Sequence, residues 1–263
     1  MEKILGRKQS IQNKDWIEAF EKIEKLVSKA ELDELVENTI QEIKKVTNDK
    51  HSAYAWSAGK DSIVLGKICE MADIKECMIA ICELEYPAFV SWIHEHEPEG
   101  LTVINTKQDI DWLFKHPDML FPSDSKTASL WFKIVQHRAQ AKYYKENNLD
   151  IIILGRRKID GNYVGKGSNI YTDAKGITRY SPLSDWSHEA ILAFLHYYKL
   201  ELPPIYDWEK GFLCGTHPWP ARQYMENEEQ GWKEVLAIDR NIVEAAANYF
   251  SKASACLKEQ NNN

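Results

Sequence analysis

The sequence predicts an α/β fold in which a doubly wound, mostly parallel sheet carries helical additions at its N- and C-terminal ends. Three observations predict it. Short apolar runs alternate with segments of helical period, and a polar loop of small residues follows the first run. The length of 263 residues, with 44% hydrophobic and 28% charged content, suits a globular chain that buries a sizeable core.

Two amphipathic helices are expected before the first strand. Apolar side chains, Trp16 and Phe20 among them, recur at helical spacing through residues 13–29, and the pattern repeats through residues 31–47. We expect these helices to form an N-terminal extension over residues 1–48.

The period then changes to that of a layered α/β sheet. The run 77–82, Cys-Met-Ile-Ala-Ile-Cys, is apolar at every position, which is typical of a strand covered on both faces. Pro87 favours the start of a helix. The expected strands are 51–56, 77–82, 101–104 and 151–154, and the expected helices are 61–72, 87–96 and 126–147.

The rest of the chain is expected to be loop and helix. Glycines scattered among polar residues over 155–180 predict a long functional loop with a short hairpin. Helices are expected at 187–199 and 229–256, before a frayed tail at 258–263. The expected division is a helical extension over 1–48, an α/β domain over 49–225 and a helical segment with a tail over 226–263.

Charge and cysteine content narrow the function classes. A net charge of −7 gives no support to binding of nucleic acid or of an anionic membrane surface. No apolar run approaches the roughly 18 residues of a membrane span. The five cysteines include no Cys-x-x-Cys pair, which predicts a reduced, cytoplasmic protein without an iron–sulfur cluster or zinc.

The loop Ser57-Ala58-Gly59-Lys60-Asp61-Ser62 carries the main chemical signal. It lies where the first strand ends and a helix begins, so free N–H groups and a partial positive charge are available there. Serine hydroxyls and a lysine add donors that suit a pyrophosphate. The loop is not a Walker A motif, because Asp61 follows the Gly-Lys pair and Tyr54 stands where the first glycine would be. A plain turn with a helix cap is the alternative.

The loop resembles the PP-loop, Ser-Gly-Gly-x-Asp-Ser, of the N-type ATP pyrophosphatases, with Ala58 in place of a glycine. Two later blocks are similar to one branch, the phosphoadenosine phosphosulfate (PAPS) reductase and ATP sulfurylase small-subunit family. They are 151–157, Ile-Ile-Ile-Leu-Gly-Arg-Arg, and 180–187, Tyr-Ser-Pro-Leu-Ser-Asp-Trp-Ser. The resemblance spans about residues 31–222 and implies the adenine nucleotide alpha hydrolase-like fold.

The resemblance also implies roles for individual residues. Lys60, Arg156 and Arg157 are implied as catalytic cations, and two arginines at a strand end suit forked binding of phosphoryl oxygens. Surface salt bridges are the alternative for both arginines. Asp185 is implied as a nucleotide contact, although it and Trp186 also suit a helix cap and a core position. The implied nucleotide-binding residues are Ser57, Ala58, Gly59, Lys60, Asp61, Ser62, Arg156, Arg157 and Asp185.

The activity implied first is cleavage of ATP between the α- and β-phosphates, with transfer of AMP to a small-molecule acceptor. The intact Lys60-Asp61-Ser62 favours ATP, whose β,γ-pyrophosphate needs these groups. Mg²⁺ is expected as a cofactor, with Asp61 as its contact. Sulfurylase small subunits of this family work with a GTPase, so a partner subunit is an open alternative.

A thiol-dependent reductase of PAPS or adenosine phosphosulfate is the second interpretation. Such enzymes carry a reactive cysteine near the C-terminus, where this chain has Cys256 without the usual Glu, Gly and His neighbours. A bystander cysteine is the simpler interpretation of that residue. Cys214 and His217 suit either loop packing or a place beside the acceptor. An ATP-binding subunit or sensor without turnover is the third interpretation.

Overall fold

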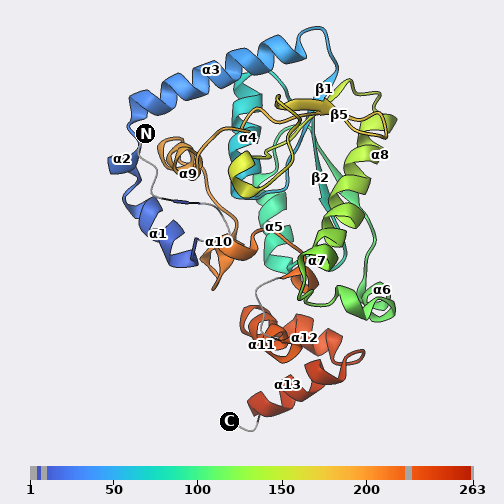
Figure 1. The fold of residues 1–263 in the computed structure, drawn as a ribbon. Coiled ribbons are helices and arrows are strands. Elements are labelled where there is room, and N and C mark those ends of the chain that lie inside the picture. Colours follow the sequence, from blue (N-terminus) through green and yellow to red (C-terminus); the bar gives the residue numbers. More distant parts are fainter. Residues whose placement is uncertain (1–4, 7–10, 223–226, 262–263) are drawn as a thin grey trace.

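The computed structural model describes residues 5–6, 11–222 and 227–261. Its centre is a six-stranded sheet with the order β3-β2-β1-β4-β6-β5 (Figure 1). Neighbouring strands run parallel except β5, which pairs antiparallel with β6. The doubly wound, mostly parallel class expected from the sequence is therefore confirmed. The strands are β1 Ser52–Ala55, β2 Cys77–Ile81, β3 Leu101–Asn105, β4 Ile151–Ile153, β5 Ile170–Thr172 and β6 Thr178–Tyr180.

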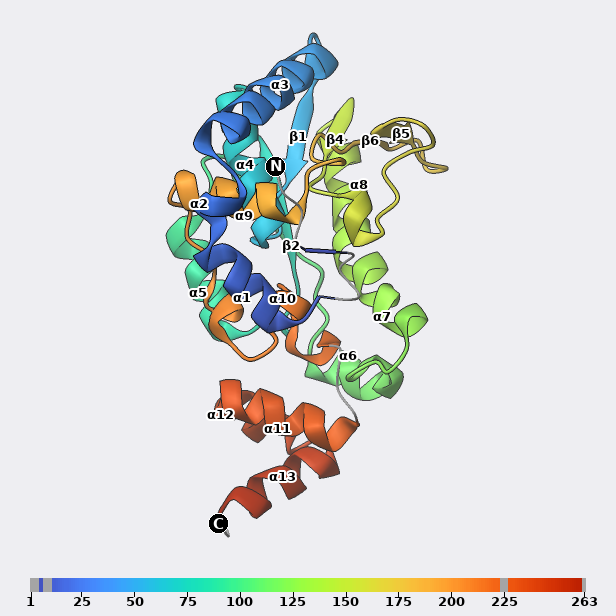
Figure 2. The same ribbon diagram turned by 60° about the vertical axis from the view of Figure 1, so that its left-hand side comes forward.

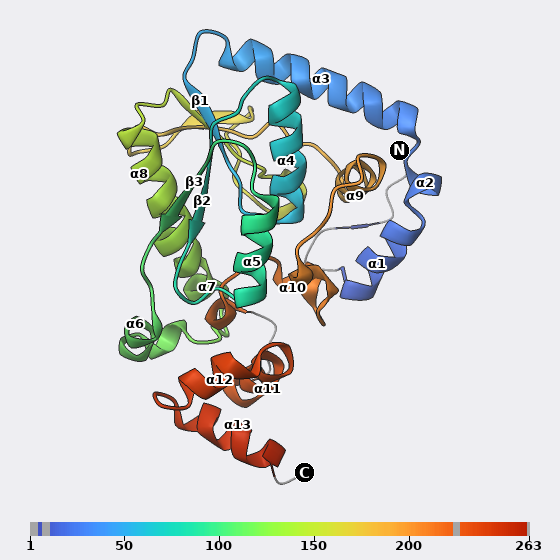
Figure 3. The ribbon, with the colours of Figure 1, turned by 180° about the vertical axis from the view of Figure 1, so that it is seen from behind.

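Helices cover both faces of the sheet (Figures 1 and 3). Of the strands that they enclose, β2 and β4 are largely or wholly buried, which explains their unbroken apolar sequences, and β1 is buried at its two central residues. One face carries α4 Lys60–Met71, α5 Pro87–His96 and α9 His188–Tyr197, with α3 Lys29–Thr47 outside them, and the other carries α7 Ser125–Trp131, a π-helix Phe132–His137 and α8 Arg138–Glu146.

The N-terminal segment differs from the single helix expected over 13–29. It forms α1 Asn13–Glu21 and α2 Ile23–Leu26, separated at Lys22. The chain becomes extended at Val27 because Ser28 caps α3, its hydroxyl accepting a hydrogen bond from the Glu31 N–H. Both short helices pack on α9 (Figure 2).

The long helix expected over 126–147 is interrupted. Its middle, Phe132–His137, is a π-helix that packs on β2, and such segments occur often at functional sites. The sequence reasoning also missed α6, Ile110–Lys115, although Asp109 provides a cap by accepting a hydrogen bond from the Trp112 N–H. The short hairpin expected within 155–180 is confirmed as β5 and β6.

The prediction of one C-terminal helix over 229–256 is wrong. The segment forms α11 Glu228–Ile238, α12 Arg240–Ala246 and α13 Ser251–Asn261, which pack on one another beyond the end of the sheet (Figure 1). Asp239 causes the first break, because its backbone is extended and its carboxylate caps α12. The frayed tail expected over 258–263 is wrong for 258–261, which belong to α13, and residues 262–263 lie outside the described residues. In the described part of the chain, no helix combines the length and apolarity needed to cross a membrane.

Candidate functional site

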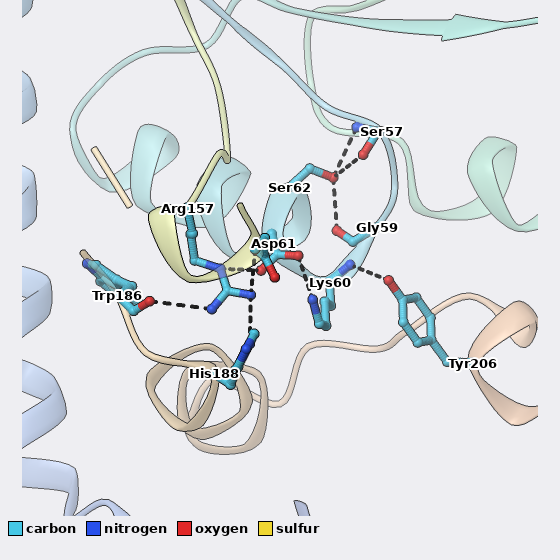
Figure 4. Close-up of polar contacts among 10 residues, drawn as sticks. Ser57, Gly59, Lys60, Asp61, Ser62, Arg157, Trp186, His188 and Tyr206 are labelled. Carbon is cyan, nitrogen blue, oxygen red and sulfur yellow. Dashed lines mark hydrogen bonds and ion pairs between the residues drawn. The ribbon is translucent and has the colours of Figure 1, made fainter. Parts of the chain in front are cut away.

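The loop Ser57–Ser62 lies at the carboxyl end of β1, where the strand order reverses between β1 and β4. Open α/β sheets bind ligands in the crevice at such a switch point. Gly59 is the N-cap of α4, so the positive end of that helix faces the same edge. The location expected for the loop from the sequence is thus the observed one (Figure 4).

Ala58 departs from ordinary backbone geometry. Its φ is +53° and its side chain is fully buried. This is the left-handed region that favours glycine, and a Cβ there costs about 1–2 kcal/mol. The position at which the PP-loop pattern has a glycine therefore does require positive φ, and alanine occupies it under strain.

Hydroxyl groups surround the backbone of Gly59. A Cβ at this residue would lie 3.2 Å from Thr216 Oγ1, 3.4 Å from Ser57 Oγ and 3.5 Å from Tyr206 OH. Ser62 Oγ adjoins them, accepting from the Ser57 N–H at 3.0 Å and donating to the Gly59 carbonyl at 2.9 Å. The absence of a side chain at Gly59 thus lets these hydroxyls gather closely around its backbone, and hydroxyl groups are suitable donors to phosphoryl or sulfonyl oxygens.

Tyr206 and Thr216 were missed as site residues by the sequence reasoning. The Lys60 N–H donates to Tyr206 OH at 2.8 Å, and Thr216 Oγ1 donates to the Ser57 carbonyl at 3.1 Å. Burial raises the pKa of Tyr206, so its hydroxyl keeps a proton to donate. The only available signal was their position just after the Asp-Trp block, which gave no role to either side chain.

Lys60 and Asp61 belong to a buried ion network (Figure 4). Lys60 Nζ lies 2.6 Å from Asp61 Oδ2, and Asp61 Oδ1 lies 2.8 Å from Arg157 Nε. Arg157 is fully buried and also contacts Asp160 at 3.0 Å and His188 Nδ1 at 3.1 Å. Arg157 therefore holds Asp61 from beneath the loop, instead of reaching outward as expected.

Arg156 has different surroundings. Its guanidinium donates to Tyr171 OH at 3.0 Å and to His137 Nε2 at 2.8 Å. Burial, followed by the charge of Arg156, lowers the pKa of His137 to about 4, so the ring is neutral and accepts. None of the ion pairs among the described residues involves Arg156, so its charge remains available to an anion at this edge.

Trp186 takes the core position that the sequence left open, whereas Asp185 is a surface residue and does not cap the following helix. Asp185 is 74% exposed and pairs with Lys158 at 2.8 Å, which together with a Ser184 hydrogen bond lowers the pKa of its carboxyl group. Trp186 is buried, and its indole N–H donates to Thr39 Oγ1. The α9 cap expected at Asp185 is instead Ser187, which accepts from the Ala190 N–H. None of the contacts of Asp185 with described residues reaches the loop.

The fit of a magnesium ion at Asp61 is poor in this arrangement. Both carboxylate oxygens of Asp61 face cationic side chains, Lys60 and Arg157. Across the described ranges, no group of three or more His, Cys, Asp or Glu side chains is placed to hold a metal ion. We therefore derive no step through a metal.

Glu85 is a further titratable group at this edge that the sequence reasoning missed. It follows β2, and its carboxylate accepts from the Cys82 N–H at 3.2 Å. Its Oε2 is buried and has no hydrogen-bond partner within the described ranges, and burial raises the pKa of the carboxyl group to about 8. Glu85 is thus largely protonated at neutral pH.

The cysteines are all buried and unpaired by disulfides. Cys256 lies in α13, at the end of the molecule opposite the N-terminal helix α3 (Figure 1), and burial raises the pKa of its thiol. Cys214 lies in the short helix α10, Gly211–Cys214, two residues before Thr216. No cysteine thiol is therefore presented to solvent as a ready thiolate.

A cavity of about 640 Å³ lies elsewhere, between α4 and α5. Its walls include the aromatic side chains Trp56 and Trp92, but none of the loop residues Ser57–Ser62 and neither arginine. Because none of these site residues lines the cavity, the candidate functional site remains the loop at the carboxyl edge of the sheet.

Comparisons with known proteins bear on the family and the fold of this chain. A curated relative, a phosphoadenosine phosphosulfate reductase of Emericella nidulans, is 22% identical over 160 residues, 60% of this chain. The match spans about half of that relative, 49% of its length. The crystal structure of a PAPS reductase from Candida auris in a phosphate complex superposes with a TM-score of 0.50 at 16% identity, covering 69% of this chain and 92% of the other, which supports the fold alone.

The family model of the phosphoadenosine phosphosulfate reductase domain matches residues 51–214. That range contains the loop, β1 to β6, both arginines, Asp185 and Tyr206, and it is more than half of the chain. This chain therefore belongs to the phosphoadenosine phosphosulfate reductase family, with the adenine nucleotide alpha hydrolase-like fold.

Proposed function

We propose that this protein binds an adenosine sulfonucleotide, PAPS or adenosine phosphosulfate, and reduces its sulfonate group. The observation that carries the proposal is the cluster of hydroxyl groups around Gly59, at the N-terminus of α4, in a chain of the PAPS reductase family. The named activity of the Emericella nidulans relative supports it. This choice replaces ATP cleavage, which the sequence favoured, as the first candidate.

The site residues divide into contacts and supports. Tyr206 accepts from the Lys60 N–H and would donate its hydroxyl proton to a phosphate or sulfonate oxygen, and Arg156 would supply a forked positive charge. Ser57, Ser62 and Thr216 donate their protons to partners within the loop, so each would have to turn from its partner to donate to the ligand. Lys60 would add positive charge at the same edge. Asp61 pairs with Lys60, and Arg157 pairs with Asp61, so these two residues would keep the Lys60 ammonium group in place. Asp185 is left outside the proposed site because it pairs with Lys158 at the surface.

The proposed chemistry balances with a dithiol as reductant. A thiolate attacks the sulfonate sulfur, the S–O bond breaks, and its electron pair leaves with the phosphate oxygen of the nucleotide. A second thiolate then attacks the thiosulfonate, which gives a disulfide and sulfite. Because the five cysteines are buried, we assign the attacking thiolate to a dithiol from solution and not to Cys256, which would first have to leave its packing in α13.

The burial of the cysteines favours one second candidate. Without a thiolate beside the loop, the intact Lys60-Asp61-Ser62 suits ATP cleavage, in which an acceptor oxygen attacks the α-phosphorus and pyrophosphate leaves. The small-molecule acceptor, the partner subunit and Mg²⁺ expected from the sequence would be components of this ATP-cleaving reaction.

One set of assays separates the two candidates. The protein is incubated with PAPS or adenosine phosphosulfate and dithiothreitol, and sulfite is measured; in parallel it receives Mg-ATP and acceptors, and AMP and pyrophosphate are measured. The proposal expects sulfite, falling about 10²–10³-fold in Lys60→Met and Arg156→Met, because each removes a preorganised charge. Lys67→Met and Cys256→Ser should retain activity. Pyrophosphate without sulfite would establish the second candidate, and tight nucleotide binding without any product would indicate a sensor.

A further inference from the structure

Helix α1 lies outside the family match of residues 51–214, and yet it contacts the loop. Its Trp16 is fully buried, and Lys60 Nζ lies 4.9 Å from the centroid of the Trp16 ring. Asn13, at the start of the helix, accepts a hydrogen bond from the Phe212 N–H at 2.9 Å, which ties α1 to α10. Figure 2 shows α1 beside α9 and α10, the elements that follow the Asp-Trp block. A segment beyond the family match thus reaches the site lysine.

The contacts of Trp16 and Lys60 close into a ring. Lys60 Nζ pairs with Asp61, and Asp61 pairs with Arg157. Arg157 donates to His188 Nδ1, and the His188 ring lies edge-on to Trp16 with centroids 4.6 Å apart. Four of these five residues lie inside the family match, and only Trp16 comes from outside it. Removing Trp16 therefore breaks this closed set of contacts next to Lys60.

The indole ring compensates a buried charge. The Lys60 side chain is only 6% exposed, so its ammonium group loses most of its contact with water. The face of a tryptophan ring attracts a cation, and this attraction is strongest where water is excluded. Among the described residues the buried Trp16 indole N–H has no hydrogen-bond partner, so the contacts of this side chain are made by its ring, which also stacks on Phe212 with centroids 5.7 Å apart.

We propose that Trp16 is a positioning residue of the nucleotide site, through which the N-terminal helix α1 fixes the ammonium group of Lys60. The inference rests on the proposed function only in that Lys60 acts on a bound nucleotide. Trp16 does not itself contact the substrate. In this proposal helix α1 helps to position a residue of the nucleotide site, in addition to packing against the helices that cover the sheet.

The first test measures the exposure of Lys60 without any nucleotide. The protein is treated with an amine acylating reagent, and the rate of labelling at Lys60 is followed by mass spectrometry, with Lys67 as the internal reference. We expect labelling of Lys60 to rise at least fivefold in Trp16→Leu and by less than twofold in Trp16→Phe, which keeps a ring. Trp232→Leu is the matched control, because Trp232 is equally buried but packs in α11 against Phe121 and Trp219. An equal rise in Trp232→Leu, or none in Trp16→Leu, would overturn the proposal.

The second test measures coupling to the ligand. Affinity for adenosine 5′-phosphosulfate is determined by titration calorimetry for the same variants. We expect about tenfold weaker binding in Trp16→Leu, less than threefold in Trp16→Phe, and no additional loss when Trp16→Leu is added to Lys60→Met. Additive losses in the double variant would show that Trp16 does not act through Lys60. If the unaltered protein binds no sulfonucleotide, the proposed function fails, while the labelling test still decides the role of Trp16.

Discussion

The guanidinium of Arg157 faces two carboxylates, Asp61 and Asp160, with no exposure to water. Arg157→Met should lower the free energy of unfolding by about 3–5 kcal/mol, because removal of one partner leaves buried charges uncompensated. Urea denaturation followed by circular dichroism measures this change. Arg240→Met is the control: its pair with Glu244 is about half exposed, and the loss should be under about 1 kcal/mol. Similar losses in the two variants would contradict the buried network.

Ala58 provides a prediction about backbone strain. Ala58→Gly relieves the left-handed strain of about 1–2 kcal/mol but loses a buried methyl group worth about 0.8 kcal/mol and adds unfolded-state entropy of about 0.4–1 kcal/mol. These terms nearly cancel, so the free energy of unfolding should change by less than about 1 kcal/mol. Ala58→Val should instead lose more than about 2 kcal/mol, because a β-branched residue is worse in this region. Thermal or urea unfolding of both variants checks the contrast, and equal stabilities would show that φ at this position is not positive.

At the scale of elements, the docking of α11 on the α/β domain depends on a close approach at Gly231. A Cβ there would lie 2.5–2.7 Å from the ring of Phe121, which is itself packed on Trp219 and Trp232. Alanine normally stabilises a helix by about 1 kcal/mol relative to glycine, but overpacking costs about 1–3 kcal/mol. Because the ring has little room to move, we expect Gly231→Ala to lower the free energy of unfolding by about 1–2 kcal/mol.

Gly66→Ala is the matched control for that prediction. Gly66 is also helical, and its added Cβ would meet Trp56 and Tyr54 at 3.3 Å, a distance that small shifts can absorb. Its net effect on the free energy of unfolding should stay within about 1 kcal/mol. A stabilised Gly231→Ala protein would mean that α11 does not sit against Phe121 as described.

At the scale of the whole molecule, Glu85 and His137 are two buried groups of the described residues that make stability depend on pH between pH 4.5 and 8. The folded pKa of Glu85 is raised to about 8, so its contribution to stability falls as pH rises from 4.5 to 8. The folded pKa of His137 is lowered to about 4, so its contribution rises as pH rises from 4 to 6.5. The two slopes oppose each other up to pH 6.5, and of these two groups Glu85 alone still changes its protonation above that pH.

The expected profile of unfolding free energy is therefore flat from pH 4.5 to 6.5 and falls by about 1–2 kcal/mol from pH 6.5 to 8. Urea denaturation in a series of buffers measures it. Glu85→Gln should remove the fall above pH 6.5, and His137→Asn should uncover a falling slope below it. A stability that rises between pH 6.5 and 8 would contradict the buried, protonated state of Glu85.

The sequence by itself determined the alternation of strands and helices, the place of the loop Ser57–Ser62 at the end of β1, and the family. Apolar periodicity, caps and glycine positions act within a few residues, so they can be recognised without knowing what packs nearby. The errors in the elements lie where local signals compete. Asp239 begins a new helix inside a segment whose apolar period continues, so one helix was expected where the chain forms three. The helix expected over 13–29 likewise divides at Lys22, where no local signal marks the break.

Only the tertiary structure decided what each site residue does. Tyr206 and Thr216 reach the loop from 146 and 159 residues away along the chain, and Trp16 reaches it from a helix outside the family match. Arg156 and Arg157 are neighbours in sequence, yet one is free of carboxylate partners within the described ranges and the other is fully buried between two. The physical reason is that the energy of a charge depends on the water and partners around it, which packing between distant segments decides.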